Sequence, residues 1–338
     1  MKKIFLFLTL IILFSSCEKL LFDENKASTD PFVNFDYLWN QIDQKYSYFE
    51  YKNINWDQIR ETYRAQIFEG MSEEQLFDVL GNMMDELRDD HSNLISPFNI
   101  SRYNIRIQNN SNYSEHVVNR YYIPNFKTFG PFHHDFIDNG RIGYIRYDSF
   151  MSEVTPDQMN YLTQYYQNTD GLILDLRANG GGSISNIFII LEAFCSESKL
   201  VAYSINRNGP HHDDFGEKEP IQVLRGTGTI YTKPVMVLID RYSYSASTFF
   251  SVITKAFDQI KLVGDYTGGG GGIPNGGQLP NGWFYRFSVS QLLDLNGNNY
   301  AEAGVPPDIT AYFNWNDMTK DEIIDAAVRE IHTMTQKK

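Results

Sequence analysis

The amino-acid sequence predicts an α/β protein, with an N-terminal helical domain and an α/β core built on a largely parallel sheet. Two patterns predict this fold class. Residues 31–94 carry apolar side chains at helical spacing, whereas residues 139–315 alternate short apolar runs with helical segments, as a parallel sheet with crossover helices requires. The chain of 338 residues, 42% of them hydrophobic, is long enough for both parts.

The N-terminus has the pattern of an export signal. Two lysines precede an apolar run, residues 4–14, that is too short to cross a bilayer. The run leads into Cys17 in a segment that resembles the lipobox of bacterial lipoproteins. We therefore expect a signal peptide over residues 1–16, a lipid on Cys17 and a polar tether over residues 17–30. The protein would then be lipid-anchored in a bacterial cell envelope, facing the periplasm or the surface.

Three amphipathic helices are expected in the N-terminal helical domain, residues 31–94. Apolar residues recur at helical spacing from Phe35 to Tyr46 and again from Trp56 to Ile67. Ser72 begins a capping box, Ser-Glu-Glu-Gln, that starts a third helix running to Leu87.

The rest of the chain divides into a linking segment, a core and a final helix. Residues 95–138 are polar, show no clear PDZ domain and are expected to link the helical domain to the core, residues 139–315. A C-terminal helix is expected within residues 316–338. The core elements expected in chain order are strand 141–147, helix 156–167, strand 172–176, helix 184–194, strand 200–205, strand 235–239, helix 246–257 and strand 260–263.

Composition argues against several functions. The net charge of −13 and the lack of a basic footprint argue against a nucleic-acid partner. The histidines lack metal-ligand spacing, and Asp294 to Asn298 lacks the glycine and glutamate of a calcium loop, so we expect no metal and no cofactor. Cys195 has no partner once Cys17 carries lipid, and its apolar surroundings predict a buried structural thiol.

Two turns, each after an apolar strand of the core, carry groups that acyl transfer needs. Asn179 to Gly182 expose backbone amides, which suits an oxyanion hole, and no Lys-Ser/Thr follows them as in a P-loop. Ser243, Ser245 and Ser247 stand where a helix begins, so each is a candidate nucleophile or an N-cap. Because active-site groups gather at the carboxyl ends of parallel strands, we expect the two turns to meet.

Three motifs in a fixed order resemble one peptidase family. They are Leu174-Asp175-Leu176-Arg177-Ala178-Asn179-Gly180-Gly181-Gly182, Ser245-Ala246-Ser247 and Gly304-Val305-Pro306-Pro307-Asp308. The chain resembles the S41 peptidases, which include C-terminal processing (tail-specific) proteases, tricorn core proteases and the repeats of interphotoreceptor retinoid-binding protein. The resemblance implies a ClpP/crotonase-like core and Ser245 as nucleophile. It also implies an oxyanion hole made by the amides of Ala246 and Gly181, or of Gly180 or Gly182 in place of Gly181.

The resemblance leads to two possible general bases. C-terminal processing proteases use a lysine in a Gly-Lys turn, but the corresponding stretch here, Gly268 to Gly272, has none. The tricorn-like branch uses a histidine at the end of the helical domain and a downstream glutamate, which correspond to His91 and Glu302. A neutral histidine can accept the serine proton near pH 7. Asp90 is a second candidate to orient His91.

Together these features imply a serine-type peptidase that hydrolyses peptide bonds of exported proteins or peptides through an acyl-enzyme on Ser245. Many S41 proteins hold a substrate's C-terminus with a PDZ domain, for which residues 95–138 are too few, so short unfolded peptides are the expected substrates. One alternative is a non-catalytic peptide- or ligand-binding envelope lipoprotein that keeps the fold. Another is an esterase or amidase acting on small molecules with the same groups.

Overall fold

The structure is a computed structural model, and it describes residues 27–104, 110–300 and 302–336. The expected signal peptide, Cys17 and most of the expected tether lie outside the described residues. Within these described ranges, no helix is long and apolar enough to cross a membrane.

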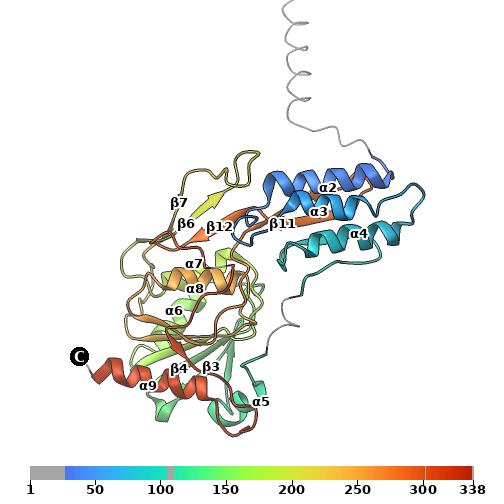
Figure 1. The fold of residues 1–338 in the computed structure, drawn as a ribbon. Coiled ribbons are helices and arrows are strands. Elements are labelled where there is room, and N and C mark those ends of the chain that lie inside the picture. The colour runs from blue at the N-terminus through green and yellow to red at the C-terminus, as the bar shows by residue number, and fades with distance from the viewer. Residues whose placement is uncertain (1–26, 105–109, 301, 337–338) are drawn as a thin grey trace, which may run out of the picture.

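Three helices form the N-terminal domain, as predicted: α2 (Pro31–Lys45), α3 (Trp56–Arg64) and α4 (Glu73–Asp85). The capping box of α4 is confirmed, since the Ser72 hydroxyl accepts the Gln75 N–H and the Gln75 side chain accepts the Ser72 N–H. The buried apolar faces of α2 and α4 pack against one another. In Figure 1 these helices lie together at one side of the molecule, away from the C-terminal helix.

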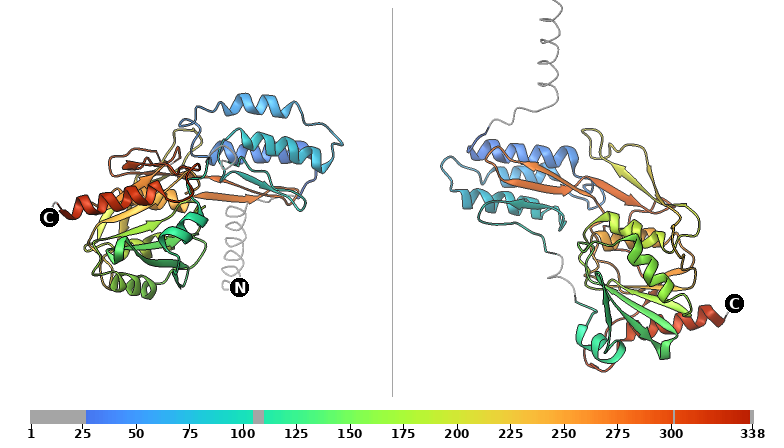
Figure 2. Two further views of the ribbon diagram at one scale, coloured as in Figure 1. Left: turned by 90° about the horizontal axis from the view of Figure 1, so that it is seen from below. Right: turned by 180° about the vertical axis from the view of Figure 1, so that it is seen from behind.

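A small antiparallel sheet completes the helical domain from far along the chain. Its strand order is β1 (Asn93–Ile95), β11 (Phe284–Ser288) and β10 (Pro274–Gln278). Tyr285 and Phe287 of β11 are buried in the same cluster as the apolar faces of α2 and α4. Figure 1 and the right view of Figure 2 both show β11 alongside the helices. The hairpin β10–β11, from the segment predicted as core, therefore packs as part of the helical domain.

The core sheet has seven strands in the order β13-β9-β8-β5-β4-β3-β2. Strands β4, β5, β8, β9 and β13 run parallel, and β2 and β3 run antiparallel at one edge, which confirms a largely parallel sheet. Their bounds are β2 (Lys127–Phe129), β3 (Phe132–Ile137), β4 (Ile142–Tyr147), β5 (Gly171–Asp175), β8 (Val235–Ile239), β9 (Ile260–Gly264) and β13 (Ile309–Thr310).

Helices cover both faces of this sheet. One face packs on α6 (Pro156–Tyr165), α7 (Ile184–Glu192) and α8 (Ala246–Thr254). The other packs on α9 (Glu322–Gln336) with the short turns α5 (Glu115–Val117) and η2 (Val118–Tyr122). Side chains alternate between the two faces along each strand, and helices cover both faces. The two central strands, β5 and β8, are therefore apolar throughout, except for Asp175 at the end of β5.

A third sheet is antiparallel, with the order β12-β6-β7. Its strands are β6 (Lys199–Asn206), β7 (Glu219–Val223) and β12 (Ser290–Leu293). The sequence predicted the strand at 200–205 but placed it among the core strands. In the structure β6 leaves the parallel sheet and pairs with the strand that continues from the β10–β11 hairpin.

The domain boundaries in the structure also differ from those expected at 95–138. Strands β2 and β3 belong to the core sheet, followed by a 3₁₀ turn, η3 (Asp138–Gly140), so the core begins well before residue 139. The polar sequence of β3 reflects its place beside an edge strand, where alternate side chains are only half-buried. In the described part of this segment, no separate domain stands between helices and core.

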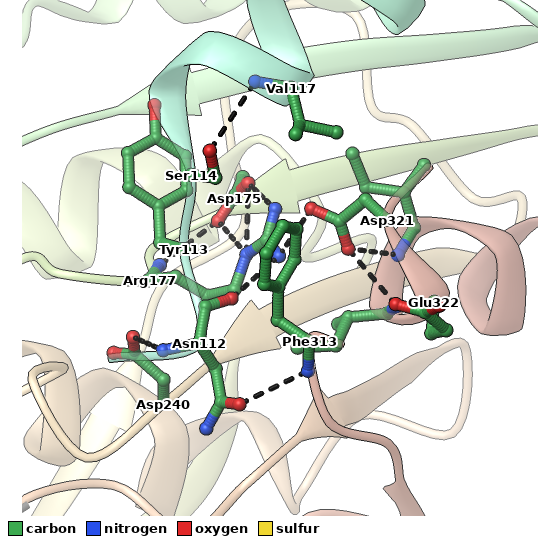
Figure 3. A network of polar contacts seen from close by, with 12 residues as sticks. Asn112, Tyr113, Ser114, Val117, Asp175, Arg177, Asp240, Phe313, Asp321 and Glu322 are labelled. Atoms are coloured by element: carbon green, nitrogen blue, oxygen red, sulfur yellow. Dashed lines mark hydrogen bonds and ion pairs between the residues drawn. The ribbon is translucent and has the colours of Figure 1, made fainter. Parts of the chain in front are cut away.

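A buried arginine ties the end of β5 to the start of α9 (Figure 3). Arg177, which is fully buried, donates from Nη2 to Asp175 Oδ2 (2.6 Å) and from Nη1 to Asp321 Oδ2 (2.8 Å) and Asn112 O (3.1 Å). Burial raises the pKa of Asp175, but Arg177 and Arg146 outweigh it and hold that pKa below its usual value. The cluster fixes the strand from which the glycine turn emerges.

Candidate active site

The two turns predicted to meet lie side by side, because β5 and β8 are parallel neighbours that end together. The carbonyl of Asn179 accepts the Tyr244 N–H (3.0 Å) and the Ser247 hydroxyl (2.8 Å). The Ser243 hydroxyl donates to the carbonyl of Leu176 (2.8 Å). Two of the three serines therefore bind one turn to the other, and their hydroxyls are occupied by structural bonds.

Ser245 differs from its two neighbours in both backbone and side chain. Its φ of 57° and ψ of −114° are strained for a residue with a side chain. The N–H donates to Gly269 O (3.1 Å) and the carbonyl accepts the Phe249 N–H in the first turn of α8 (2.9 Å). Its hydroxyl makes no capping bond to the helix. The turn thus presents the Ser245 hydroxyl instead of using it as an N-cap.

His91 meets Ser245 across 154 positions of sequence. Its Nε2 lies 2.9 Å from Ser245 Oγ. His91 is 6% exposed, and its ring packs edge-on against Tyr244, with centroids 5.1 Å apart. The main-chain N–H of His91 donates to Asp89 Oδ1 (2.9 Å), and Asp89 Oδ2 accepts the Ser288 hydroxyl (2.8 Å). The turn after α4 is therefore anchored to β11 where it brings His91 to the core.

The surroundings of His91 favour its neutral form. Burial lowers its pKa below the ordinary value of 6.5; Asp89 opposes this shift and Arg286 adds to it. A neutral ring leaves Nε2 able to accept a proton when Nδ1 carries the ring hydrogen. His91 Nδ1 is buried and has no well-formed hydrogen bond to the described residues. The Gly272 backbone lies close enough to raise the His91 pKa, although burial outweighs this effect.

Glu302, the residue that corresponds to the tricorn-like glutamate, makes no hydrogen bond to the His91 ring in the described part of the chain. Its Oε1 lies 2.5 Å from Lys52 Nζ, and its Oε2 accepts the Gly271 N–H (3.3 Å). The reason is that Lys52, from the loop after α2, captures the carboxylate. Asp90, the second candidate, accepts the Asn104 N–H at Oδ1 (3.2 Å) and also makes no hydrogen bond to the ring.

Lys52 is a site residue that the sequence analysis missed. Its ammonium also donates to the carbonyls of Leu87 (3.1 Å) and Arg88 (2.9 Å), immediately before the turn that carries His91. Burial, and then the nearby charge of Asp89, raise the pKa of Glu302 to about 7. Burial raises the pKa of Asp89 too, but Lys52 and His91 outweigh it and hold that pKa low. An isolated lysine in a loop gave no signal in the sequence.

The two predicted oxyanion donors are brought together, but one is engaged. Gly181 (φ 95°) approaches Ala246 so closely that a Cβ at Gly181 would lie 2.8 Å from Ala246 N. The Gly181 N–H donates to Asn179 Oδ1 (3.0 Å) in this conformation. Ala246 is the first residue of α8, where helix amides lack intrahelical acceptors. Gly180 and Gly182 line the same cleft.

The cleft over these groups has a volume of about 630 Å³. Its charged lining residues are Asp90, Arg102 and Arg286, besides His91, and no lysine is among the described residues that line it. No group of three His, Cys, Asp or Glu residues in the described ranges could hold a metal ion. Cys195 lies elsewhere, buried, and burial raises the pKa of its thiol.

Comparison with known families assigns both parts of the chain. The model of peptidase family S41 matches residues 141–311, and that of the tricorn protease C1 domain matches residues 29–85. The crystal structure of a putative peptidase from Parabacteroides merdae is 34% identical, with a TM-score of 0.85 over 90% of this chain and 97% of that chain. The chain belongs to peptidase family S41.

More distant S41 proteins share the core or the fold. The chloroplastic carboxyl-terminal-processing peptidase 3 of Arabidopsis thaliana is 24% identical over 55% of this chain and 34% of its own length. The carboxy-terminal processing protease CtpB of Bacillus subtilis is 25% identical over 50% of this chain and 33% of its own. The matches thus span about a third of these relatives. Mature CPAF shares the fold, with a TM-score of 0.67 at 13% identity over 91% of this chain and 98% of that chain.

Proposed function

We propose that this S41 protein is a serine peptidase in which Ser245 is the nucleophile and His91 is the general base. The observation that carries the proposal is the 2.9 Å separation of His91 Nε2 and Ser245 Oγ, within the reach that proton transfer needs. The strained backbone of Ser245 and the lowered pKa of His91 support it. Ser243 and Ser247, whose hydroxyls have structural partners, do not compete for the role.

The reaction proceeds in two halves. Ser245 Oγ attacks the peptide carbonyl carbon while its proton passes to His91 Nε2, and the oxyanion forms beside the amide of Ala246. His91 then gives the proton to the leaving amine nitrogen, the C–N bond breaks, and an acyl-enzyme remains on Ser245. Water attacks the acyl carbon with His91 again as base, which releases the carboxylic acid and restores the hydroxyl.

We propose that Glu302 supports His91 through other residues. Glu302 and Lys52 join the turn that ends at His91 to the glycine loop of the core, because Lys52 holds the carbonyls of Leu87 and Arg88 and Glu302 holds the Gly271 N–H. The ion pair would thereby fix His91 against Ser245 without touching the ring.

Labelling with a fluorophosphonate tests the proposal directly. The wild-type protein should be labelled at Ser245 and should cleave unfolded peptides, whereas S245A and H91A should lose both activities. A matched control is S196A, which removes an exposed serine away from the cleft and should change neither. Labelling without peptide cleavage, but with hydrolysis of small acyl esters, would instead support the esterase alternative. Absence of both reactions, with binding of peptides retained, would support the non-catalytic alternative.

We further propose that the protein is exported and anchored by a lipid on Cys17, with exported peptides or proteins as substrates. The sequence before the described residues carries this proposal, through its charged start, short apolar run and lipobox-like cysteine. Mass spectrometry of the membrane fraction should find a diacylglyceryl group on Cys17. The C17S variant should move to the soluble fraction; retention of C17S in the membrane would contradict the proposal.

A further inference from the structure

The charges of the active-site cleft differ from those of the whole chain. The chain carries a net charge of −13, yet the charged groups lining the cleft, apart from neutral His91, are Arg102, Arg286 and Asp90. Both arginines are exposed, and neither has an ion-pair partner within 4.0 Å among the residues that the structure describes. Asp90 is already an acceptor for the Asn104 N–H. The cleft therefore keeps one excess positive charge in an acidic protein.

Arg286, an exposed residue, is held at one nitrogen by the buried side chain of Asn93. Its Nε donates to Asn93 Oδ1 (2.7 Å), directly across the β1–β11 pair. Asn93 is 4% exposed, and its amide donates to the carbonyls of Ser101 (3.2 Å) and Asp90 (3.4 Å), which fixes the direction of its oxygen. With Nε fixed, the two terminal nitrogens of Arg286 have no acceptor among the described residues and remain available to a ligand.

Asn93 and Arg286 lie next to His91 and Ser245. Asn93 follows His91 by two residues, and the charge of Arg286 is close enough to lower the His91 pKa. The same cleft is lined by Ser245, the glycine turn and Arg286, so one peptide bound in it can contact both Ser245 and Arg286. A guanidinium held at one nitrogen and open at two others suits bidentate binding of a carboxylate.

We propose that the cleft recognises a carboxylate of the peptide substrate, bound by Arg286 with help from Arg102. This inference rests on the proposed peptidase function and names its substrate class. The carboxylate has two possible sources, an Asp or Glu side chain near the scissile bond or the free C-terminus of a short peptide. A single carboxylate balances the excess charge of the cleft, whereas a basic peptide would meet repulsion.

Kinetics with paired peptides test the proposal. Quenched fluorescent peptides that differ only by Glu or Gln at each position, and peptides with a free or an amidated C-terminus, separate the two sources. We expect one pair to show a preference of about tenfold in kcat/KM for the carboxylate, decreasing with added salt. R286Q should abolish the preference, R102Q should reduce it, and R286E should favour Lys over Glu. The matched control R225Q removes an exposed arginine outside the cleft and should keep it.

Binding to the S245A variant separates failure of this inference from failure of the peptidase function. Fluorescence anisotropy with the same peptides needs no catalysis, so S245A should bind the carboxylate peptide about tenfold more tightly than its neutral partner, and S245A/R286Q should not. A wild-type enzyme that cleaves all pairs equally would overturn the proposal, as would equal binding of all peptides to S245A. If peptides bind with the expected preference but are never cleaved, the carboxylate site stands and the peptidase function falls.

Discussion

Replacing Lys52 by methionine tests how the two domains hold His91, the proposed general base. Lys52 and Glu302 are only 11% and 5% exposed in their side chains and lie 2.5 Å apart. Methionine keeps most of the apolar length of lysine but removes the positive charge that lowers the pKa of both Glu302 and Asp89. It also removes the donor to the carbonyls that precede the His91 turn.

The expected loss follows from leaving a buried carboxylate without its partner. Removal of one member of a buried ion pair costs about 3–5 kcal/mol of unfolding free energy. The double variant K52M/E302Q no longer contains the stranded charge, so part of the stability should return and the two changes should not add. Because the Glu302 pKa is raised to about 7 in the folded protein and is near 4.5 when unfolded, the folded state binds more protons between these pH values. Stability carried by this group therefore falls as pH rises through that window, and K52M should extend the fall to higher pH.

Urea denaturation at pH 5 and pH 8, with fluorophosphonate labelling of Ser245 at each pH, measures both effects. We expect K52M to lose more stability at pH 8 than at pH 5 and to label more slowly at the pH where the wild type is fully active. K45M, on the exposed side of α2, is the matched control and should change stability by about 0.5 kcal/mol or less. The reasoning is refuted if K52M matches the wild type in both readouts, or if K52M/E302Q is as unstable as the sum of its single variants.

Three further predictions concern the site and its support. The rate of Ser245 labelling should rise with pH through a single pKa below 6.5, as deprotonation of buried His91 requires; a midpoint above 6.5 would contradict this assignment. G181A should lose stability and lose activity by about a hundredfold, because its methyl group would lie 2.7 Å from Tyr244 O and 2.8 Å from Ala246 N at a positive φ; calorimetry at a temperature where the variant is still folded separates the two losses. R177M should lower the unfolding free energy by about 3–5 kcal/mol, since it leaves buried Asp321 without its cation and Asp175 with Arg146 alone, and an unchanged melting temperature would count against the role of this cluster.

Local patterns were sufficient to predict the parallel core and the two turns. Apolar runs of strand length, each followed by a helical segment, lead directly to a sheet whose carboxyl ends collect the turns. The capping box at Ser72 predicted the start of α4 to the residue. These features depend on neighbours in sequence, so a single chain contains the information.

The remaining features depend on contacts between distant segments. The hairpin β10–β11 packs on the N-terminal helices although about 200 residues separate β11 from β1, with which it pairs (Asn93 with Arg286). Lys52 lies 250 positions from Glu302 by sequence number, and no local pattern marks either residue as a partner of the other. The sequence of a strand such as β6 does not show whether the strand joins the parallel sheet or a separate antiparallel one.

The resemblance pointed to Glu302 as the residue behind His91, but it did not predict which groups Glu302 contacts. Resemblance placed a glutamate near the histidine, and the structure does bring Glu302 into the same buried region, but as the partner of Lys52. The carboxylate that contacts His91 is Asp89, through the main-chain N–H, so it fixes the turn while the ring remains neutral. A carboxylate on Nδ1 would raise the His91 pKa, whereas burial here lowers it. Comparing E302Q with D89N separates these roles: D89N should shift the pH midpoint of Ser245 labelling further down, while E302Q should lower the rate and leave the midpoint in place.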